Sequence, residues 1–369
     1  MNSFHEENLA ALVTLLNDRD VDGCLIYPGP NLLYVSGFFG EPGDRHTILY
    51  VSAQEEVSFL TPEKYIEQIK QGSWISEFTP VSAGTGQALA TGVVENIASK
   101  GQTLALDPHL PYEIARPILS RLSKVSIESA ADLFEQLRLR KDPREIKLLE
   151  NSGVLADQVS TEIRKMGKEA IGMTERELAN EIRGRLLGGG GTRVSFPIVV
   201  CSGPNGAIPS LRHGDRTIQK NEPVILDFGA YLSGYASDQT RTVVFDGTPP
   251  AGFLDAWEAV NEALDVGVST VEPGIPIGAV DEAVESVLVE AGFKENLRHA
   301  TGHGIGLEAH EAPAVHVDNS MTIEEGMAFS IEPGVYFPEK FGVRVEDIVV
   351  VDGGEAKRIN YSPRTWQAL

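Results

Sequence analysis

The sequence predicts two domains, an α/β domain followed by an α+β domain. Its 369 residues suffice for two hydrophobic cores, at about 150 residues per domain. In the first part, short apolar strand patterns alternate with helical patterns, which is typical of an α/β fold. In the second part, two capped helices precede antiparallel hairpins, which favours an α+β fold. We therefore predict one domain at residues 1–135 and another at residues 136–369.

The composition excludes several classes of protein. With 31 Lys+Arg and 53 Asp+Glu residues the formal net charge is −22, so nucleic acid is a poor partner. The apolar runs are far shorter than the ~20 residues that span a bilayer, and the amino terminus lacks a signal-peptide pattern. We therefore expect a cytoplasmic protein without a membrane partner. Cys24 and Cys201 each lie in an apolar stretch, which favours reduced, buried thiols.

The first domain begins with a helix whose apolar face carries Leu9, Leu12, Leu15 and Leu16. A buried strand is expected at residues 24–27, and a helical pattern restarts after the Gly29-Pro30 turn signal. The remaining predicted elements are strands at 47–51, 57–60 and 103–106 and helices at 62–71, 91–100 and 111–122.

The second domain opens with two helix-start signatures. Asp142-Pro143-Arg144-Glu145 has an N-cap, a proline at the first helical position and a glutamate three residues past the cap, so a helix is expected to about residue 166. Thr174-Glu175-Arg176-Glu177 repeats the capping box and predicts a helix that ends at Gly188. The remaining predicted elements are strands at 195–201, 224–230 and 235–245, helices at about 251–268 and 277–291, and a strand-rich run at 327–351.

Two aspartates meet in the hairpin predicted at the start of this strand-rich half. A turn at Leu232-Ser233 puts Asp227 directly opposite Asp238, whereas a turn at Ser233-Gly234 makes them diagonal neighbours on the same face. Opposed like charges destabilise a hairpin, so a positive group is expected between them, and Arg241 is the nearest candidate. The alternative is a pair of surface aspartates near a turn.

A glycine-rich run holds three of the eight histidines of the chain, His299, His303 and His310. The glycines at alternate positions of 302–306 argue against a helix, so we expect an extended or looped segment whose imidazoles approach one site. Histidine together with oxygen ligands suits a first-row divalent metal. For any single histidine of this run, packing in the core is the alternative.

Acidic residues also interrupt apolar runs near the C-terminus. Glu332 precedes a Pro-Gly turn, and Arg344 and Glu346 share one face of an apolar strand. Because an unpaired buried carboxylate is costly, an Arg344–Glu346 ion pair is one explanation. Together with the two hairpin aspartates, the glutamates supply four negative charges, which two divalent cations would nearly balance beside a neutral His303 nitrogen.

The order Asp, Asp, His, Glu, Glu resembles that of the metal ligands in the M24 or "pita-bread" metallopeptidases, the family of methionine aminopeptidase, aminopeptidase P and prolidase. The match spans residues 196–351 and is closest to the Xaa-Pro peptidases, through the segments SGPNGA (202–207), DQTRT (238–242), HATGHGIG (299–306) and VRVED (343–347). Residues from about 7 to 135 resemble the creatinase-type domain of this branch. The resemblance implies an α/β creatinase-like domain followed by an α+β pita-bread catalytic domain.

The resemblance also implies a dinuclear metal site. Asp227 would chelate one ion and His303 the other, while Asp238 and Glu346 would bridge the two, and Glu332 would be the fifth ligand. Mn²⁺ is the expected metal, with Co²⁺ or Zn²⁺ as alternatives, because an oxygen-rich site with one imidazole is not selective by affinity.

Further residues receive catalytic roles from the same resemblance. Glu332 would also shuttle a proton from the water that bridges the metals. His299 and His310 would stabilise the oxyanion and orient the substrate. Arg344 would hold the bridging carboxylates in place.

One position departs from the family pattern. Ser210, 17 residues before Asp227, stands where relatives have a histidine that helps to hold the substrate. One hypothesis is that Ser210 or the displaced His213 takes over this role, and another is that the substrate preference has changed. For His213, a position on a surface loop is the simpler alternative. Binding of a dipeptide carboxylate needs a cation, for which Arg45 and Arg212 are candidates; for each of them a solvated surface charge is the equal alternative.

The preferred function is hydrolysis of the Xaa-Pro bond of dipeptides by a metal-bridging hydroxide, as in a prolidase. An Xaa-Pro aminopeptidase that acts on longer peptides is the first alternative. A creatinase-like amidinohydrolase does without the metal site, and a non-catalytic peptide-binding relative would be expected to have lost ligands. The expected partners are a small peptide with proline at its second position and a second copy of the chain in a homodimer.

Overall fold

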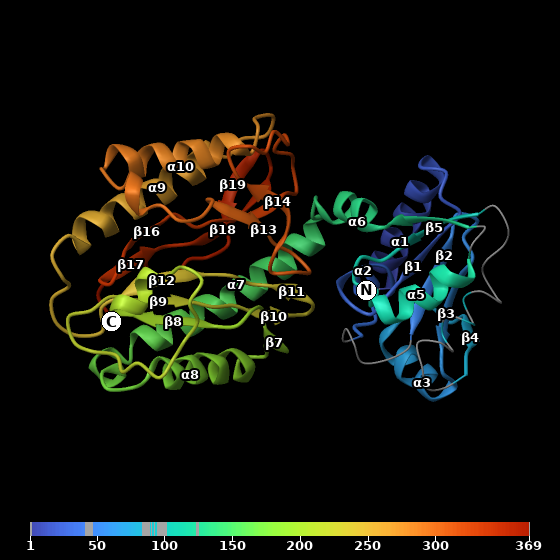
Figure 1. The fold of residues 1–369 in the computed structure, drawn as a ribbon, viewed down its shortest axis with the longest axis horizontal. Helices are drawn as coiled ribbons and strands as arrows, with labels where there is room; N and C mark the ends of the chain where they lie inside the picture. Colours follow the sequence, from blue (N-terminus) through green and yellow to red (C-terminus); the bar gives the residue numbers. More distant parts are fainter. Residues whose placement is uncertain are drawn as a thin grey trace. The chain divides into compact units, whose positions relative to one another are not determined.

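The computed structural model describes residues 2–40, 47–82, 89, 91, 93, 102–122 and 125–368. The chain divides into two compact units, Met1–Arg138 and Leu139–Leu369, and each is described by itself (Figure 1). Arg45 and most of the helix predicted at 91–100 lie outside the described residues.

The N-terminal unit is a mixed sheet with helices in the connections. Its strands follow the order β4-β3-β2-β1-β5-β6. Fully buried β1 pairs antiparallel with β2 and parallel with β5, so the sheet changes from antiparallel to parallel at its centre. The elements are α1 (Asn2–Asp18), β1 (Gly23–Ile26), α2 (Pro30–Ser36), β2 (Ile48–Ser52), β3 (Val57–Thr61), α3 (Glu63–Gly72), β4 (Phe78–Pro80), β5 (Thr103–Leu106), α5 (Tyr112–Arg121), β6 (Ser126–Ser129) and α6 (Ala131–Arg138).

Four long helices frame the C-terminal unit: α7 (Pro143–Arg164), α8 (Glu175–Gly188), α9 (Phe253–Thr270) and α10 (Gly278–Glu290). Both predicted capping boxes are present, with Asp142 at the start of α7 and Thr174 at the start of α8. In each box the cap side chain accepts from the backbone of the third helical residue, so the first free N–H groups are satisfied locally. Short 3₁₀ turns lie at Gly167–Ala170 (η1), Gly203–Ala207 (η2) and Lys294–Asn296 (η3).

The strands of this unit lie between the helix pairs, with α7 and α8 on one side and α9 and α10 on the other (Figure 1). One core joins α7 and α8 to the first strands, and a second core joins α9 and α10 to the last ones. The strands are β7 (Arg193–Val194), β8 (Val199–Ser202), β9 (Val224–Asp227), β10 (Ala230–Leu232), β11 (Tyr235–Ala236), β12 (Thr240–Val243), β13 (Gly302–Gly304), β14 (Glu311–Val315), β15 (Ala328–Ile331), β16 (Gly334–Phe337), β17 (Phe341–Arg344), β18 (Asp347–Asp352) and β19 (Glu355–Arg358).

The aspartate hairpin adopts the second of the two predicted registers. Asp227 pairs with Thr240, and Ser233 and Gly234 form the turn with φ of 52° and 90°. Positive φ at both central residues is the geometry that matches the twist of paired strands. Asp238 is therefore a diagonal neighbour of Asp227. The two predicted strands are each broken into two, and the break lies where Gly229 faces the Ser237 backbone without room for a side chain.

Two smaller expectations can be compared with the structure. Cys24 and Cys201 are both free and buried, as predicted. None of the helices in the part of the chain that the structure describes combines the length and apolar character that a membrane crossing requires.

Gly229 and Gly184 give a matched test of this packing. A Cβ at Gly229 would lie 1.8 Å from the Ser237 carbonyl oxygen, whereas a Cβ at Gly184, within α8, meets nothing within 4 Å. We expect Gly229→Ala to destabilise the C-terminal unit by at least about 1–3 kcal/mol, and Gly184→Ala to stabilise it by about 0.5–1 kcal/mol. Calorimetric melting of both variants checks this. Equal melting temperatures would contradict the close approach.

Candidate metal centre

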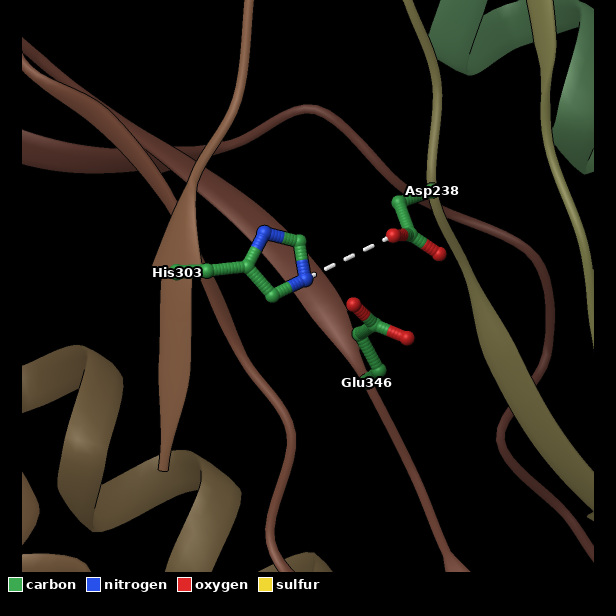
Figure 2. Close-up of side chains that lie close together, drawn as sticks. All are labelled: Asp238, His303 and Glu346. Carbon is green, nitrogen blue, oxygen red and sulfur yellow. Dashed lines mark ion pairs between the residues drawn. The ribbon is translucent and has the colours of Figure 1, made fainter. Parts of the chain in front are cut away.

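Three side chains from separate strands converge in the C-terminal unit. Asp238 follows β11, His303 lies on β13 and Glu346 follows β17, and one ligand atom from each lies within 4.8 Å of the others. The His303 Nε2 atom is 3.7 Å from the Asp238 Oδ2 atom. Figure 2 shows this ring nitrogen directed toward the Asp238 carboxylate, with Glu346 beside both. The arrangement offers one nitrogen and several oxygens to a shared volume.

The other two predicted ligands border the same cluster. Glu332, just after β15, places its Oε1 atom 3.5 Å from His303 Nε2. Asp227 ends β9, and its negative charge acts on the carboxyl groups of Asp238, Glu332 and Glu346. The structure thus brings together all five residues that the sequence nominates as metal ligands.

The hydrogen bonding of these carboxylates is incomplete. Asp227 Oδ1, Asp238 Oδ1 and Glu346 Oε1 are buried and have no hydrogen-bond donor among the described residues. The second oxygen of two of these carboxylates does have a donor. Asp227 Oδ2 accepts from Arg344, and Glu346 Oε2 accepts from the Thr240 hydroxyl at 2.7 Å. Buried acceptors without partners are costly and rare. Three such oxygens beside an imidazole nitrogen fit divalent cations, which take this donor set.

The electrostatics point the same way. Burial, and then repulsion from Glu346, raises the pKa of Asp238 well above its ordinary value. Burial and repulsion from Glu332 do the same to the pKa of Glu346. Burial raises the pKa of Glu332 to about 7, although the nearby Arg344 charge opposes the rise. Asp238, Glu332 and Glu346 therefore resist ionisation until positive charge enters the cluster.

His303 is held in the form that suits a metal ligand. Its Nδ1 atom lies 3.1 Å from the Gly304 carbonyl oxygen, which can only accept, so Nδ1 carries the proton and the Nε2 lone pair faces the carboxylates. Burial, reinforced by the neighbouring His310, lowers the pKa of His303 to about 4. The imidazole is therefore neutral near pH 7.

Arg344 supplies the positive charge, and this corrects two expectations from the sequence. Its guanidinium bonds Asp227 rather than Glu346, because Asp227 reaches it from the neighbouring sheet while Glu346 turns toward Thr240. Arg241 does not lie between the aspartates; it bonds Asp347 at 2.7 Å and the Glu346 carbonyl oxygen at 2.6 Å. Arg241 therefore fixes the backbone that carries Glu346.

Tyr336 is a site residue that the sequence reasoning missed. It is fully buried on β16, and its hydroxyl oxygen accepts from Arg344 Nη1 at 2.9 Å. The same hydroxyl lies 2.7 Å from His299 Nε2, while His299 Nδ1 faces the Ala300 carbonyl oxygen at 2.8 Å. Nδ1 must donate to that carbonyl, so Tyr336 donates to Nε2. The available signal was its cross-strand partner Gly342, whose missing side chain leaves room for the ring.

His310 lies beside the cluster with its ring accessible. Its ring centroid is 4.0 Å from that of His303, and the edge of Phe196 packs near it at 6.5 Å between centroids. Both His310 and His299 are exposed, but His299 uses both ring nitrogens for bonds to the protein. His310 is thus the more available donor for a bound substrate.

The residues proposed to replace the family histidine lie on one loop. Ser210 and Arg212 are exposed, and His213 directs Nδ1 to the Ile198 carbonyl oxygen at 2.7 Å. This loop is tied to the fold by the buried Glu175, which accepts from Ser202 and Gly214. Arg45 is outside the described residues. The substrate contacts of these four residues stay predictions.

Comparison with known proteins identifies the family. The model of metallopeptidase family M24 matches residues 147–353, and that of the creatinase/prolidase N-terminal domain matches residues 8–140. An Xaa-Pro dipeptidase of Lactobacillus helveticus is 33% identical, over 93% of this chain and 94% of that protein.

Solved structures agree over the whole length. The prolidase of Thermococcus sibiricus superposes with a TM-score of 0.92 at 31% identity and covers 99% of both chains. An X-Pro aminopeptidase of Thermotoga maritima superposes with a TM-score of 0.86 at 27% identity, over 98% of this chain and 99% of that one. The predicted creatinase-like domain followed by a pita-bread catalytic domain is confirmed. The chain belongs to metallopeptidase family M24.

Proposed function

We propose that this protein is an Xaa-Pro dipeptidase, which hydrolyses the bond before proline in a dipeptide. The observation that carries the proposal is the set of buried carboxylate oxygens without partners, arranged around a neutral His303 nitrogen. The prolidase and dipeptidase names of whole-length relatives support the substrate class. The similarity to an X-Pro aminopeptidase keeps longer peptides as the second candidate.

Five residues would hold two divalent cations: Asp227, Asp238, His303, Glu332 and Glu346. Four carboxylates bring four negative charges, which two such cations balance. When bound, these ions polarise the scissile carbonyl group and lower the pKa of water. We assign Mn²⁺ to the site, with Co²⁺ and Zn²⁺ as alternatives, because oxygen donors and one imidazole suit all three.

The chain's own groups carry out the rest of the proposed reaction. Glu332 takes a proton from the attacking water and returns it to the leaving proline nitrogen, a role that a carboxylate beside the metal ions can fill. His310 donates to the substrate oxygen where charge develops. His299 shares in orienting the substrate from its position against Tyr336. Arg344 keeps Asp227 in place and offsets the cluster's negative charge.

The remaining predictions concern recognition and assembly. A dipeptide offers its carboxylate as a handle, and Arg212 and Arg45 are the proposed cations, with Ser210 or His213 in place of the family histidine. A homodimer in the cytoplasm is the assembly and location that we propose. The two buried free thiols support a reducing compartment.

A substrate comparison tests the function. On Mn²⁺-reconstituted protein, we expect release of proline from an Xaa-Pro dipeptide with a higher kcat/KM than cleavage of the corresponding Xaa-Pro-Xaa tripeptide. An Xaa-Ala dipeptide is the control for the proline requirement. A higher kcat/KM on the tripeptide would identify an aminopeptidase. Absence of turnover on all three peptides would remove the peptidase proposal.

Replacement of one cluster carboxylate tests its assigned role. We expect Asp238→Asn to lower kcat by at least about 100-fold, since loss of even a residue that merely supports a ligand costs about 10–100-fold. Asp215→Asn is the control, because Asp215 is 81% exposed and pairs with surface Arg176. Circular dichroism should show the same fold in both variants. Near-normal kinetics of Asp238→Asn would contradict a metal-binding role.

Metal removal should change the pH dependence of stability. In the metal-free protein, the raised pKa values of Asp238, Glu332 and Glu346 mean that the folded chain binds protons more tightly than the unfolded chain. The three carboxyl groups contribute fully to the free energy of unfolding below about pH 4. This stabilisation is lost as the pH rises through their pKa values in the folded chain, a value of about 7 for Glu332.

The measurement is the melting temperature from about pH 5 to pH 8, with EDTA and with Mn²⁺. We expect the metal-free protein to lose stability toward pH 8 and Mn²⁺ to restore it. The double variant Asp238→Asn/Glu332→Gln should show a weaker pH dependence than the unaltered protein in EDTA. Identical curves for the variant and the unaltered protein would show that the cluster does not govern the effect.

A further inference from the structure

A buried ion pair lies behind the loop that carries His310. The Lys141 Nζ atom is 2.8 Å from the Glu311 Oε1 atom, and the two side chains are only 1% and 8% exposed. Each buried charge needs the other as its counter-charge. Because neither side chain can move into water, the pair restrains the positions of Lys141 and Glu311. Glu311 is the next residue after His310, so the pair acts on the backbone that carries this histidine.

The ion pair closes a tight turn around His310. The second Glu311 oxygen accepts from the Glu308 backbone N–H at 3.2 Å, and the Gly306 N–H donates to the Glu308 carbonyl at 3.0 Å. A Cβ at Gly306 would lie 2.4 Å from Glu311 Oε1 and 3.0 Å from Lys141 Cε. The pair therefore sits directly on the Gly306 backbone.

Two further contacts orient the outer side of this turn. The Ala309 N–H donates to the Tyr231 hydroxyl at 3.2 Å, and the Ala236 N–H donates to the Gly306 carbonyl at 2.8 Å. These contacts tie the turn to the hairpin that carries the two aspartates. Lys141 itself is fixed by its backbone N–H, which donates to the Gly326 carbonyl at 2.7 Å.

We propose that Lys141 is a positioning residue for the peptidase reaction, acting through Glu311 to hold His310 against the cluster. The inference rests on the proposed function, in which His310 donates to the substrate. Lys141 touches neither substrate nor metal ligands in this role. It lies between the regions matched by the two family models, which end at residue 140 and begin at residue 147.

The alternative is that the ion pair only stabilises the fold. The two roles differ in what happens to His310 once the Lys141–Glu311 ion pair is removed. A purely structural pair lowers the melting temperature and leaves kcat of the folded enzyme unchanged. A positioning pair lowers kcat of folded, metal-loaded enzyme, because misplacement of a substrate-orienting group by about 1 Å costs about 100-fold in rate.

The test uses a variant designed to fold. Lys141→Met/Glu311→Gln removes both charges together, which avoids a lone buried charge, and the glutamine oxygen can still accept from Glu308. We expect kcat on an Xaa-Pro dipeptide to fall at least about tenfold at unchanged metal content, with KM changed less than kcat. The single variant Lys141→Arg, which keeps the charge, should retain most of the activity of the unaltered enzyme. Arg140→Met is the matched control, because the adjacent Arg140 pairs with Glu324 on the surface and is 55% exposed.

A double-mutant cycle identifies the route of the effect. If the pair acts through His310, then adding Lys141→Met/Glu311→Gln to His310→Ala should lower kcat no further than His310→Ala does alone. Equal loss in both backgrounds would overturn the proposal, as would full activity of Lys141→Met/Glu311→Gln.

A crystal structure of the metal-free Lys141→Met/Glu311→Gln protein gives a readout that does not depend on turnover. We expect the His310 ring to leave its place against His303, where the centroids are now 4.0 Å apart. An unmoved ring would overturn the proposal even if the enzyme has another substrate. An inactive unaltered enzyme on Xaa-Pro peptides, with a displaced ring in the variant, would instead contradict only the proposed function.

Discussion

The catalytic unit is organised around the repulsion of four carboxylates that share one buried volume. Arg344 offsets only part of this charge, since its guanidinium bonds Asp227 and the Tyr336 hydroxyl. Three carboxylate oxygens face the interior without donors among the described residues. Bringing four carboxylates together raises the free energy of the folded chain. The contacts of the surrounding strands must offset this repulsion, and bound cations would remove it. The paired strands, the hairpin turns and the arginine contacts hold the cluster together.

The scaffold achieves convergence by bonding segments that are far apart in the chain. Thr240 donates its hydroxyl to Glu346, and Arg241 donates to the Glu346 carbonyl oxygen. Strand β12 therefore holds the connection between β17 and β18 in place. Tyr336 then connects Arg344 to His299. Asp227, Glu346 and His299 are therefore parts of one hydrogen-bonded structure centred on Arg344.

Local signals in the sequence were sufficient for much of this architecture. The capping boxes at Asp142 and Thr174 are complete within four residues, and the aspartate register follows from which two residues form the turn. The partner of Arg344 was not predictable, because Asp227 lies 117 positions away and only the packing of two sheets brings it near. Tyr336 was missed for a different reason, because a tyrosine in an apolar strand is typical of a core residue. The order of the N-terminal sheet likewise depends on long-range pairing.

The central claim is that this carboxylate cluster exists to bind divalent cations. Anomalous diffraction from crystals soaked in Mn²⁺ measures this most directly. The account predicts two anomalous peaks between Asp227, Asp238, His303, Glu332 and Glu346, separated by about 3.5–4 Å. An electron-density map in which the five side chains keep their places and no anomalous signal appears among them would contradict it.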